Sequence, residues 1–191
     1  HMSSADGFDG TGDAPWKPDD PTAPRNAFGR TKLAGEAAIR DAGGPHVILR
    51  TSWVFSAHGD NFLTAVLRQS RQQEPLEFDI EDISAPTPGF DLARACLISA
   101  ERLLEDRTLS GTYHYQGAPC VSRVDFAREI LDQAGIDRDV VEKRHKRPES
   151  IPARNGRLDC TRADTDLGMR QPDWRRGISF ILDDLGLLKR T

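Results

Sequence analysis

Cysteine is scarce in this chain of 191 residues, which holds only Cys96, Cys120 and Cys160 and has no C-x-x-C pair. An odd number of widely separated cysteines argues against a disulfide framework, and the missing pair argues against a zinc site or a dithiol redox centre. We therefore expect no bound metal, reduced cysteines that serve as small apolar side chains, and a cytoplasmic protein.

Long apolar runs and a surplus of basic residues are also absent. No apolar stretch approaches the roughly 20 residues that a membrane-spanning helix needs, and no charged-then-apolar signal segment opens the chain. The 26 lysines and arginines are outnumbered by 30 aspartates and glutamates, so the net charge is −4. We expect neither a membrane nor a nucleic acid among the partners of this chain.

The glycine motif of dinucleotide-binding proteins is missing as well. No G-x-G-x-x-G follows a predicted strand, and Gly29, Gly35, Gly43 and Gly44 have a different spacing and context. In that motif the glycines bring the backbone close to a diphosphate at the N-terminus of a helix. The sequence therefore predicts that the usual cradle for a dinucleotide cofactor is absent from this chain.

The spacing of apolar residues predicts an α/β protein. Helices are expected over about 26–41, 61–73, 90–105, 122–135 and 174–185, where apolar residues recur at helical spacing between capping signals. Strands are expected over 46–50 and 112–115, the first as a buried parallel strand. Residues 3–25, rich in Gly, Pro and Asp, are expected to form a surface loop, with His1-Met2 as an expression-tag remnant. Helices that alternate with short strands are typical of an α/β layout.

The segment Asn26–Glu36 has the layout of a Tyr-x-x-x-Lys reductase site in which the tyrosine is replaced. Phe28 takes the first position and Lys32 the last, one helical turn apart, so the two side chains share a face. A lysine ammonium beside a phenol lowers the pKa of the phenol and prepares it as a general acid. Because a phenyl ring has no proton to give, the segment indicates a reductase family and predicts that the proton donor is lost.

Several blocks of sequence stand in the order found in one family. They are FDGTGDAPW at 8–16, PRNAFGRTKLAGE at 24–36, LRTSWVF at 49–55 followed by Asn61-Phe62, APT at 85–87, GTYH at 111–114 and PDW at 172–174. Together they resemble the carboxyl-terminal part of the dTDP-4-dehydrorhamnose reductases, which are extended short-chain dehydrogenase/reductases. The resemblance implies a partial Rossmann-like sheet with a smaller C-terminal α/β substrate-binding domain. It divides the chain into a loop at 1–25, a remnant of the cofactor domain at 26–56 and the substrate-binding domain at 57–191.

The resemblance also assigns an activity and roles to single residues. It implies NADPH-dependent reduction of the nucleotide sugar dTDP-4-keto-rhamnose in dTDP-rhamnose biosynthesis, and leaves a role for Mg²⁺ open. The implied catalytic positions are Lys32, Phe28 in place of the tyrosine, and Ala5 in place of a serine or threonine. The implied cofactor contacts are Lys32, Arg50 and Thr51. The implied substrate contacts are Trp53, Asn61, Phe62, Thr87 and Arg154.

Several of these residues also have a plain structural interpretation. Lys32 suits the surface of a helix, Trp53 suits a core, Asn61 suits an N-cap, and Pro86-Thr87-Pro88 suits a turn. The basic run at 143–147 is more typical of a solvated segment than of a phosphate site.

Three hypotheses about the whole chain follow. The first is an inactive carboxyl-terminal part of such a reductase, without the tyrosine, the hydroxyl residue and the cofactor half. The second is a non-catalytic regulatory module, similar to the regulatory subunit of methionine adenosyltransferase, which resembles the same reductases. The third is that a partner chain or a second copy supplies the missing half. On the third hypothesis the strand at 46–50 has an unpaired edge that needs cover.

Overall fold

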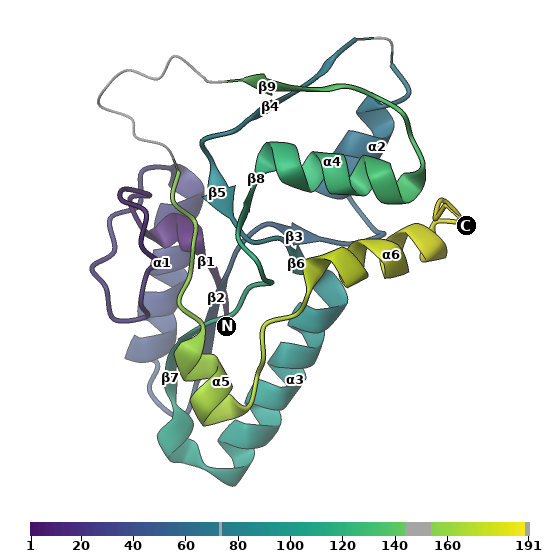
Figure 1. The fold of residues 1–191 in the computed structure, drawn as a ribbon. Helices are drawn as coiled ribbons and strands as arrows, with labels where there is room; N and C mark the ends of the chain where they lie inside the picture. The colour runs from purple at the N-terminus through teal and green to yellow at the C-terminus, as the bar shows by residue number, and fades with distance from the viewer. Residues whose placement is uncertain (73, 144–153, 190–191) are drawn as a thin grey trace.

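The computed structural model describes residues 1–72, 74–143 and 154–189, and Figure 1 shows the arrangement of its helices and strands. A parallel three-stranded sheet contains β1 (Met2–Ser4), β2 (Val47–Thr51) and β7 (Gly111–His114), in the order β1-β2-β7. Every residue of the central strand β2 is buried, as its run of apolar residues predicts. Leu49 pairs with Met2 on one side and with Tyr113 on the other.

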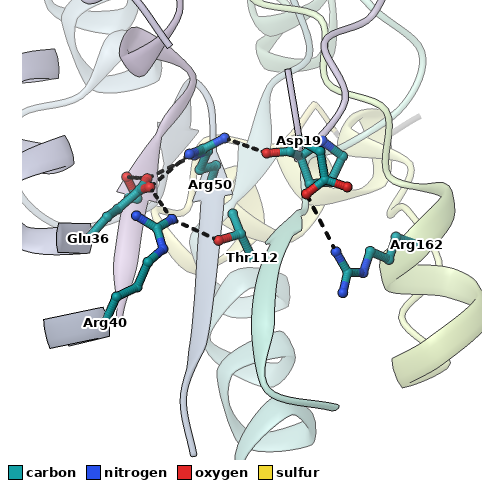
Figure 2. A network of polar contacts seen from close by, with 8 residues as sticks. Asp19, Glu36, Arg40, Arg50, Thr112 and Arg162 are labelled. Carbon is teal, nitrogen blue, oxygen red and sulfur yellow. Dashed lines mark hydrogen bonds and ion pairs between the residues drawn. The ribbon is translucent and has the colours of Figure 1, made fainter. Parts of the chain in front are cut away.

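Helices cover both faces of this sheet. On one face, Val47, Leu49 and Tyr113 pack in one apolar cluster with residues of α3 (Gly89–Glu105) and α5 (Thr161–Leu167). The other face is covered by α1 (Ala27–Asp41), which contacts β1. Because side chains alternate along a strand, Arg50 of β2 lies on the α1 face. The Arg50 guanidinium there meets Glu36 of α1 (Figure 2).

A second apolar core joins three further helices. These are α2 (Phe62–Gln69), α4 (Arg123–Ala134) and α6 (Trp174–Asp184). Small strand pairs surround them: β3 (Val54–Phe55) with β6 (Thr87–Pro88), β4 (Leu76–Asp79) with β9 (Val140–Lys143), and β5 (Ile83–Ser84) with β8 (Val121–Ser122). Two short 3₁₀ turns, η1 (Ala5–Gly7) and η2 (Arg107–Leu109), complete the elements of the described chain. Figure 1 shows α2, α4 and α6 grouped at one end of the three-stranded sheet.

The α/β class, the five helices and the two strands expected from sequence are confirmed, with small shifts at their ends. The helix expected over 61–73 ends earlier, at Gln69. The three cysteines are free. None of the described helices is long and apolar enough to cross a membrane. Most of the basic run at 143–147 lies outside the described residues.

Two expectations about the start of the chain are wrong. Ser3 and Ser4, expected in a surface loop, belong to β1, and even His1 accepts a backbone hydrogen bond from Leu49. The strand β1 is stabilised by its pairing with β2. It has too few apolar residues to give a strand pattern that could be recognised in the sequence. The strand at 46–50 therefore has no unpaired edge, because β2 lies between β1 and β7. Within the described residues, the strands with a single neighbour in this sheet are β1 and β7.

Candidate functional site

A cavity of about 1030 Å³ lies at the carboxyl ends of β1 and β2. Its walls come from six segments. They are the end of β1 with η1, the first turns of α1, residues 51–54 between the end of β2 and the start of β3, residues 82–84, Arg123 and residues 154–156. In open α/β sheets ligands bind at this edge, because the loops that leave neighbouring parallel strands converge there. The cavity is large enough for a small organic ligand.

The first turns of α1 bring the two residues of the reductase-like motif into this cavity. The Asn26 side chain caps the helix by accepting a hydrogen bond of 2.7 Å from the Gly29 amide. Phe28 is 53% exposed, and the Lys32 ammonium lies 5.6 Å from the centre of its ring. Lys32 Nζ donates to the Met2 carbonyl oxygen at 3.1 Å. The predicted shared face is confirmed, with an aromatic ring where a proton donor would stand.

Gly29 allows α1 to lie directly against η1. A β-carbon at this position would stand 2.1 Å from the Asp6 carbonyl oxygen and 2.9 Å from Pro24 Cβ. We expect Gly29→Ala to lower the free energy of unfolding by about 1–3 kcal/mol, since backbone has to move to make room. It should also displace Phe28 and Lys32 from the cavity wall. Urea unfolding followed by circular dichroism measures the first effect.

Gly35→Ala is the matched control for Gly29→Ala, because it lies in the same helix. Its β-carbon would approach only the His1 side chain, at 3.0 Å, which can turn away. Alanine is favoured over glycine in a helix by up to about 1 kcal/mol, so we expect this variant to be neutral or more stable. Equal destabilisation by the two substitutions would contradict the close approach at Gly29.

The end of β1 supplies a hydroxyl group one residue before the position that the resemblance implies. Ala5, the residue assigned to the serine/threonine position, lines the cavity within η1 and has no hydroxyl. Its neighbour Ser4 also lines the cavity. Ser4 Oγ donates to Asp6 Oδ2 at 2.9 Å and accepts from the Asp6 amide at 3.1 Å. A predicted strand ending at Ser4 would have pointed to this hydroxyl, but three residues are too few to show a strand pattern in the sequence.

Trp53 lies beside the cavity in an uncommon backbone conformation. It lies two residues after the end of β2 and has φ +43°, the left-handed region that non-glycine residues seldom adopt. The Arg123 guanidinium carbon stands 3.7 Å from the centre of the Trp53 ring and 4.7 Å from that of Phe62. Burial lowers the pKa of Arg123 to about 10, although the nearby Asp82 and Asp6 carboxylates act in the opposite direction. Arg123 is therefore a positive group at neutral pH.

A second, smaller cavity of about 430 Å³ shares two of these walls. Trp53, Val54 and Arg123 line both cavities, and Asn61 with residues of α2, among them Phe62, lines only the smaller one. Asn61 also serves as the N-cap of α2, in a capping box with Thr64, and its amide nitrogen donates to the Ser56 carbonyl at 2.9 Å. Both interpretations of Asn61, an N-cap and a cavity residue, are compatible with this position.

Thr51 and Arg154 also reach the larger cavity. The Arg154 guanidinium forms an ion pair with the Asp6 carboxylate, and the Arg154 amide donates to Asp82 Oδ1 at 3.1 Å. One wall of the cavity thus carries acidic and basic groups side by side. The pairing with Asp6 partly offsets the positive charge of Arg154.

Arg50 and Thr87, two further residues implied by the resemblance, do not line either cavity. Arg50 is buried and donates two hydrogen bonds of 2.8 Å to the Glu36 carboxylate and one of 3.1 Å to the Pro18 carbonyl (Figure 2). Thr87 is fully buried, donates to the Ser52 carbonyl at 2.7 Å and accepts from the Gly117 amide. Both side chains are occupied within the protein.

The described residues do not form the usual dinucleotide cradle. Of the three strands in the parallel sheet, β1 leads into η1, β2 leads to β3, and β7 leads to β8. None of them passes through a glycine-rich turn into the N-terminus of a long helix, which is where a dinucleotide diphosphate binds. Within the same residues, no cluster of His, Cys, Asp or Glu could hold a metal ion.

Comparisons with known proteins identify the family of this chain. A family model described as the RmlD substrate binding domain matches residues 1–187. The dTDP-4-dehydrorhamnose reductases of Salmonella typhimurium and Escherichia coli K12 are 33% and 34% identical to this chain, in alignments of 195 positions that cover 97% of it. The chain spans 64% of the length of each of these relatives.

Solved structures show the same fold. A dTDP-4-dehydrorhamnose reductase from Clostridium acetobutylicum superposes with a TM-score of 0.83 and 26% identity, covering 97% of this chain and 65% of that one. A UDP-glucose 4-epimerase from Brucella ovis, in complex with NAD, has a TM-score of 0.78 and 21% identity, covering 99% and 65%. The matched family model and the level of identity lead to one conclusion. The chain belongs to the RmlD substrate-binding domain family.

Proposed function

We propose that this chain binds a nucleotide sugar of the dTDP-4-dehydrorhamnose class, as the substrate side of a protein similar to dTDP-4-dehydrorhamnose reductase. The observation that carries the proposal is the larger cavity, into which Lys32, Ser4, Trp53 and Arg154 converge from four separate segments. An ammonium group and a hydroxyl group suit a polar sugar, an aromatic ring suits its apolar face, and a guanidinium group suits phosphate.

The same cavity supports the inference that the chain by itself does not reduce its ligand. Reduction of a keto sugar needs a hydride donor and a proton for the carbonyl oxygen. Lys32 and Ser4 could donate hydrogen bonds to that oxygen, but Phe28 has no proton to transfer. Loss of a general acid costs a factor of about 10²–10⁴ in rate. The described residues also form no dinucleotide cradle, which is a larger obstacle, because a hydride donor that is not bound is not positioned.

We expect no oxidation of NADPH when the chain is mixed with dTDP-4-keto-rhamnose, and weak binding of dTDP. A dissociation constant in the high-micromolar to millimolar range, about −4 to −6 kcal/mol, is expected because ordering the ligand and the loops around the cavity offsets much of the binding energy. NADPH absorbance measures the turnover, and ligand-observed NMR measures the binding. Phe28→Tyr should restore no activity. Clear turnover by the unaltered chain, or NADPH binding tighter than that of dTDP, would contradict the proposal.

Phe28 also favours a second candidate, a non-catalytic regulatory module. An exposed aromatic ring in place of the donor, 53% accessible, suits binding without chemistry. A regulatory subunit should co-purify in fixed ratio with an enzyme partner, whereas the substrate side of a reductase should co-purify with a cofactor-binding chain or with neither. A homodimer and a cytoplasmic location stay predictions.

A further inference from the structure

Arg123 occupies a position between the two cavities that no sequence motif assigned. It is the first residue of α4, next to the N-cap Ser122. Its guanidinium group lies over the rings of Trp53 and Phe62, at 3.7 Å and 4.7 Å from their centres. Stacking on two rings fixes the plane of the guanidinium and leaves its N–H groups directed around the edge of that plane.

Among the described residues, no hydrogen-bond acceptor is found for the Arg123 guanidinium. The two rings contact its face, and the Asp82 and Asp6 carboxylates act on it as nearby charges. Two other arginines beside the cavities are paired, Arg154 with Asp6 and Arg68 with Asp60 at 3.1 Å, whereas Arg25 and Lys32 line only the larger cavity. A half-buried guanidinium that keeps its charge but has no hydrogen-bond acceptor is costly unless water or a ligand supplies one. Among the cations of the cavity walls, Arg123 is the one that lines both cavities, and its N–H groups are available to an anionic ligand.

The positions of the two cavities indicate which part of a ligand would meet Arg123. The larger cavity holds the groups suited to a sugar carbonyl, Lys32 and Ser4, at its β1 end. The smaller cavity offers an aromatic ring, Phe62, and the Asn61 amide, which suit a nucleoside base. Trp53 and Arg123 line both cavities. A nucleotide sugar that extends from one cavity to the other would carry its diphosphate past this pair.

We propose that Arg123 binds the diphosphate of the nucleotide sugar, with Trp53 as the platform that holds its guanidinium in place. This inference rests on the proposed function and deepens it by assigning the charged linker of the ligand to one residue. Guanidinium and phosphate form paired hydrogen bonds of matching geometry, which an ammonium group cannot reproduce. The unusual φ of Trp53 has a role in this arrangement, because it sets the ring against the guanidinium.

The test compares dTDP, dTMP and thymidine as probes for the unaltered chain, Arg123→Met and Arg123→Lys. We expect Arg123→Met to weaken dTDP at least about tenfold, the loss expected for a charged hydrogen bond, and to leave thymidine within about twofold. Arg123→Lys should recover part of the loss, since it keeps the charge but not the paired geometry. Increasing salt should weaken dTDP binding to the unaltered chain more steeply than binding to Arg123→Met.

Arg128→Met is the matched control, because Arg128 lies in the same helix, pairs with Glu142 at 3.1 Å and lines neither cavity. It should bind dTDP like the unaltered chain. Thermal unfolding of each variant reports whether it is folded. A folded Arg123→Met that binds dTDP unchanged overturns the role of Arg123 and leaves the proposed function intact. Equal weakening of dTDP and thymidine overturns it too, because the residue would then act through packing. Absence of dTDP binding to the unaltered chain overturns both proposals.

Discussion

Glu36→Gln is expected to lower the free energy of unfolding by about 3–5 kcal/mol, the usual cost of removing one partner of a buried ion pair. The Glu36 side chain is fully buried and accepts two hydrogen bonds of 2.8 Å from Arg50, which is 3% exposed. It also accepts from Ser3 Oγ at 2.5 Å and from Arg40 at 2.9 Å (Figure 2). A neutral amide would leave the Arg50 charge buried without compensation. Urea unfolding measures the difference.

Glu105→Gln provides the control for this substitution. Glu105 is also in a helix and also pairs with an arginine, Arg102 at 2.9 Å, but its side chain is 65% exposed. Exposed pairs contribute at most about 1 kcal/mol. If Glu36→Gln and Glu105→Gln lowered stability equally, the buried cluster around Glu36 would not have the strength that its geometry indicates.

The pH dependence of stability gives an independent check on Glu36. Burial alone would raise the pKa of Glu36, but the hydrogen bonds from Arg50 and Ser3 outweigh burial and lower that pKa from 4.5 to about 2. A carboxyl group whose pKa is lower in the folded state stabilises the protein above its unfolded pKa. That contribution is lost as the pH falls from about 4.5 to about 2. Glu36→Gln should therefore flatten the stability curve in this range.

The titration of His114 changes the stability of the protein at a higher pH than that of Glu36, so the two contributions can be measured separately. Burial and the nearby Arg50 charge lower the pKa of His114 from 6.5 to about 4. Because the unfolded chain takes up the proton first, this histidine reduces stability as the pH falls from about 6.5 to about 4. Glu36→Gln should leave the slope in that higher range largely in place.

Much of the fold could be predicted because its main elements carry local signals. The run at 47–51 is apolar and follows Gly43-Gly44-Pro45, and Asn26 precedes α1 as an N-cap. The strand Met2–Ser4 and the two-residue pairs β3–β6 and β5–β8 have no comparable signal. They exist because segments far apart in the sequence meet and exchange backbone hydrogen bonds, which a local pattern does not reveal.

The candidate site, like the fold, contains residues that a local pattern predicts and residues that it does not. The i,i+4 spacing placed Phe28 and Lys32 on one face, and the cavity confirms that they lie together. Arg50 looked equally suitable for a ligand, since it precedes Thr51 at the end of a strand. Its side chain, however, points to the α1 face, where Glu36 binds it. A glutamate three positions from both Leu33 and Ile39, two residues expected to pack inward, was the available sign of that pairing.

Arg123 could not be found from sequence, because its position depends on tertiary structure. It follows an ordinary N-cap serine, and an arginine at the start of a helix is usually solvated. The folded chain brings α4 against residues 53 and 62, which lie about 60 to 70 positions earlier in the sequence. Residues whose role depends on such contacts are recognised only when the structure is known.

Trp174→Ala is the second substitution for which we expect a large effect, about 3–5 kcal/mol of lost stability. Trp174 is 1% exposed, begins α6 and contacts Phe126 of α4 edge to face, at 5.5 Å between ring centres. Its indole N–H donates to the Pro119 carbonyl at 2.8 Å. Alanine would leave a cavity where α4 and α6 meet, and Pro119 O would lose its partner.

Two matched variants separate the contribution of the buried ring of Trp174 from that of its indole hydrogen bond. Trp174→Phe keeps most of the ring but removes the indole N–H, so we expect a loss of about 1–3 kcal/mol from the unpaired carbonyl and the smaller volume. Phe180→Ala removes another aromatic ring from α6, but that ring is 60% exposed, and the loss should stay below about 1 kcal/mol. Chemical denaturation of the three variants ranks them. If Phe180→Ala proved as damaging as Trp174→Ala, the apolar core between α4 and α6 would not be what anchors α6, and the exposed face of that helix would have to carry the missing contacts.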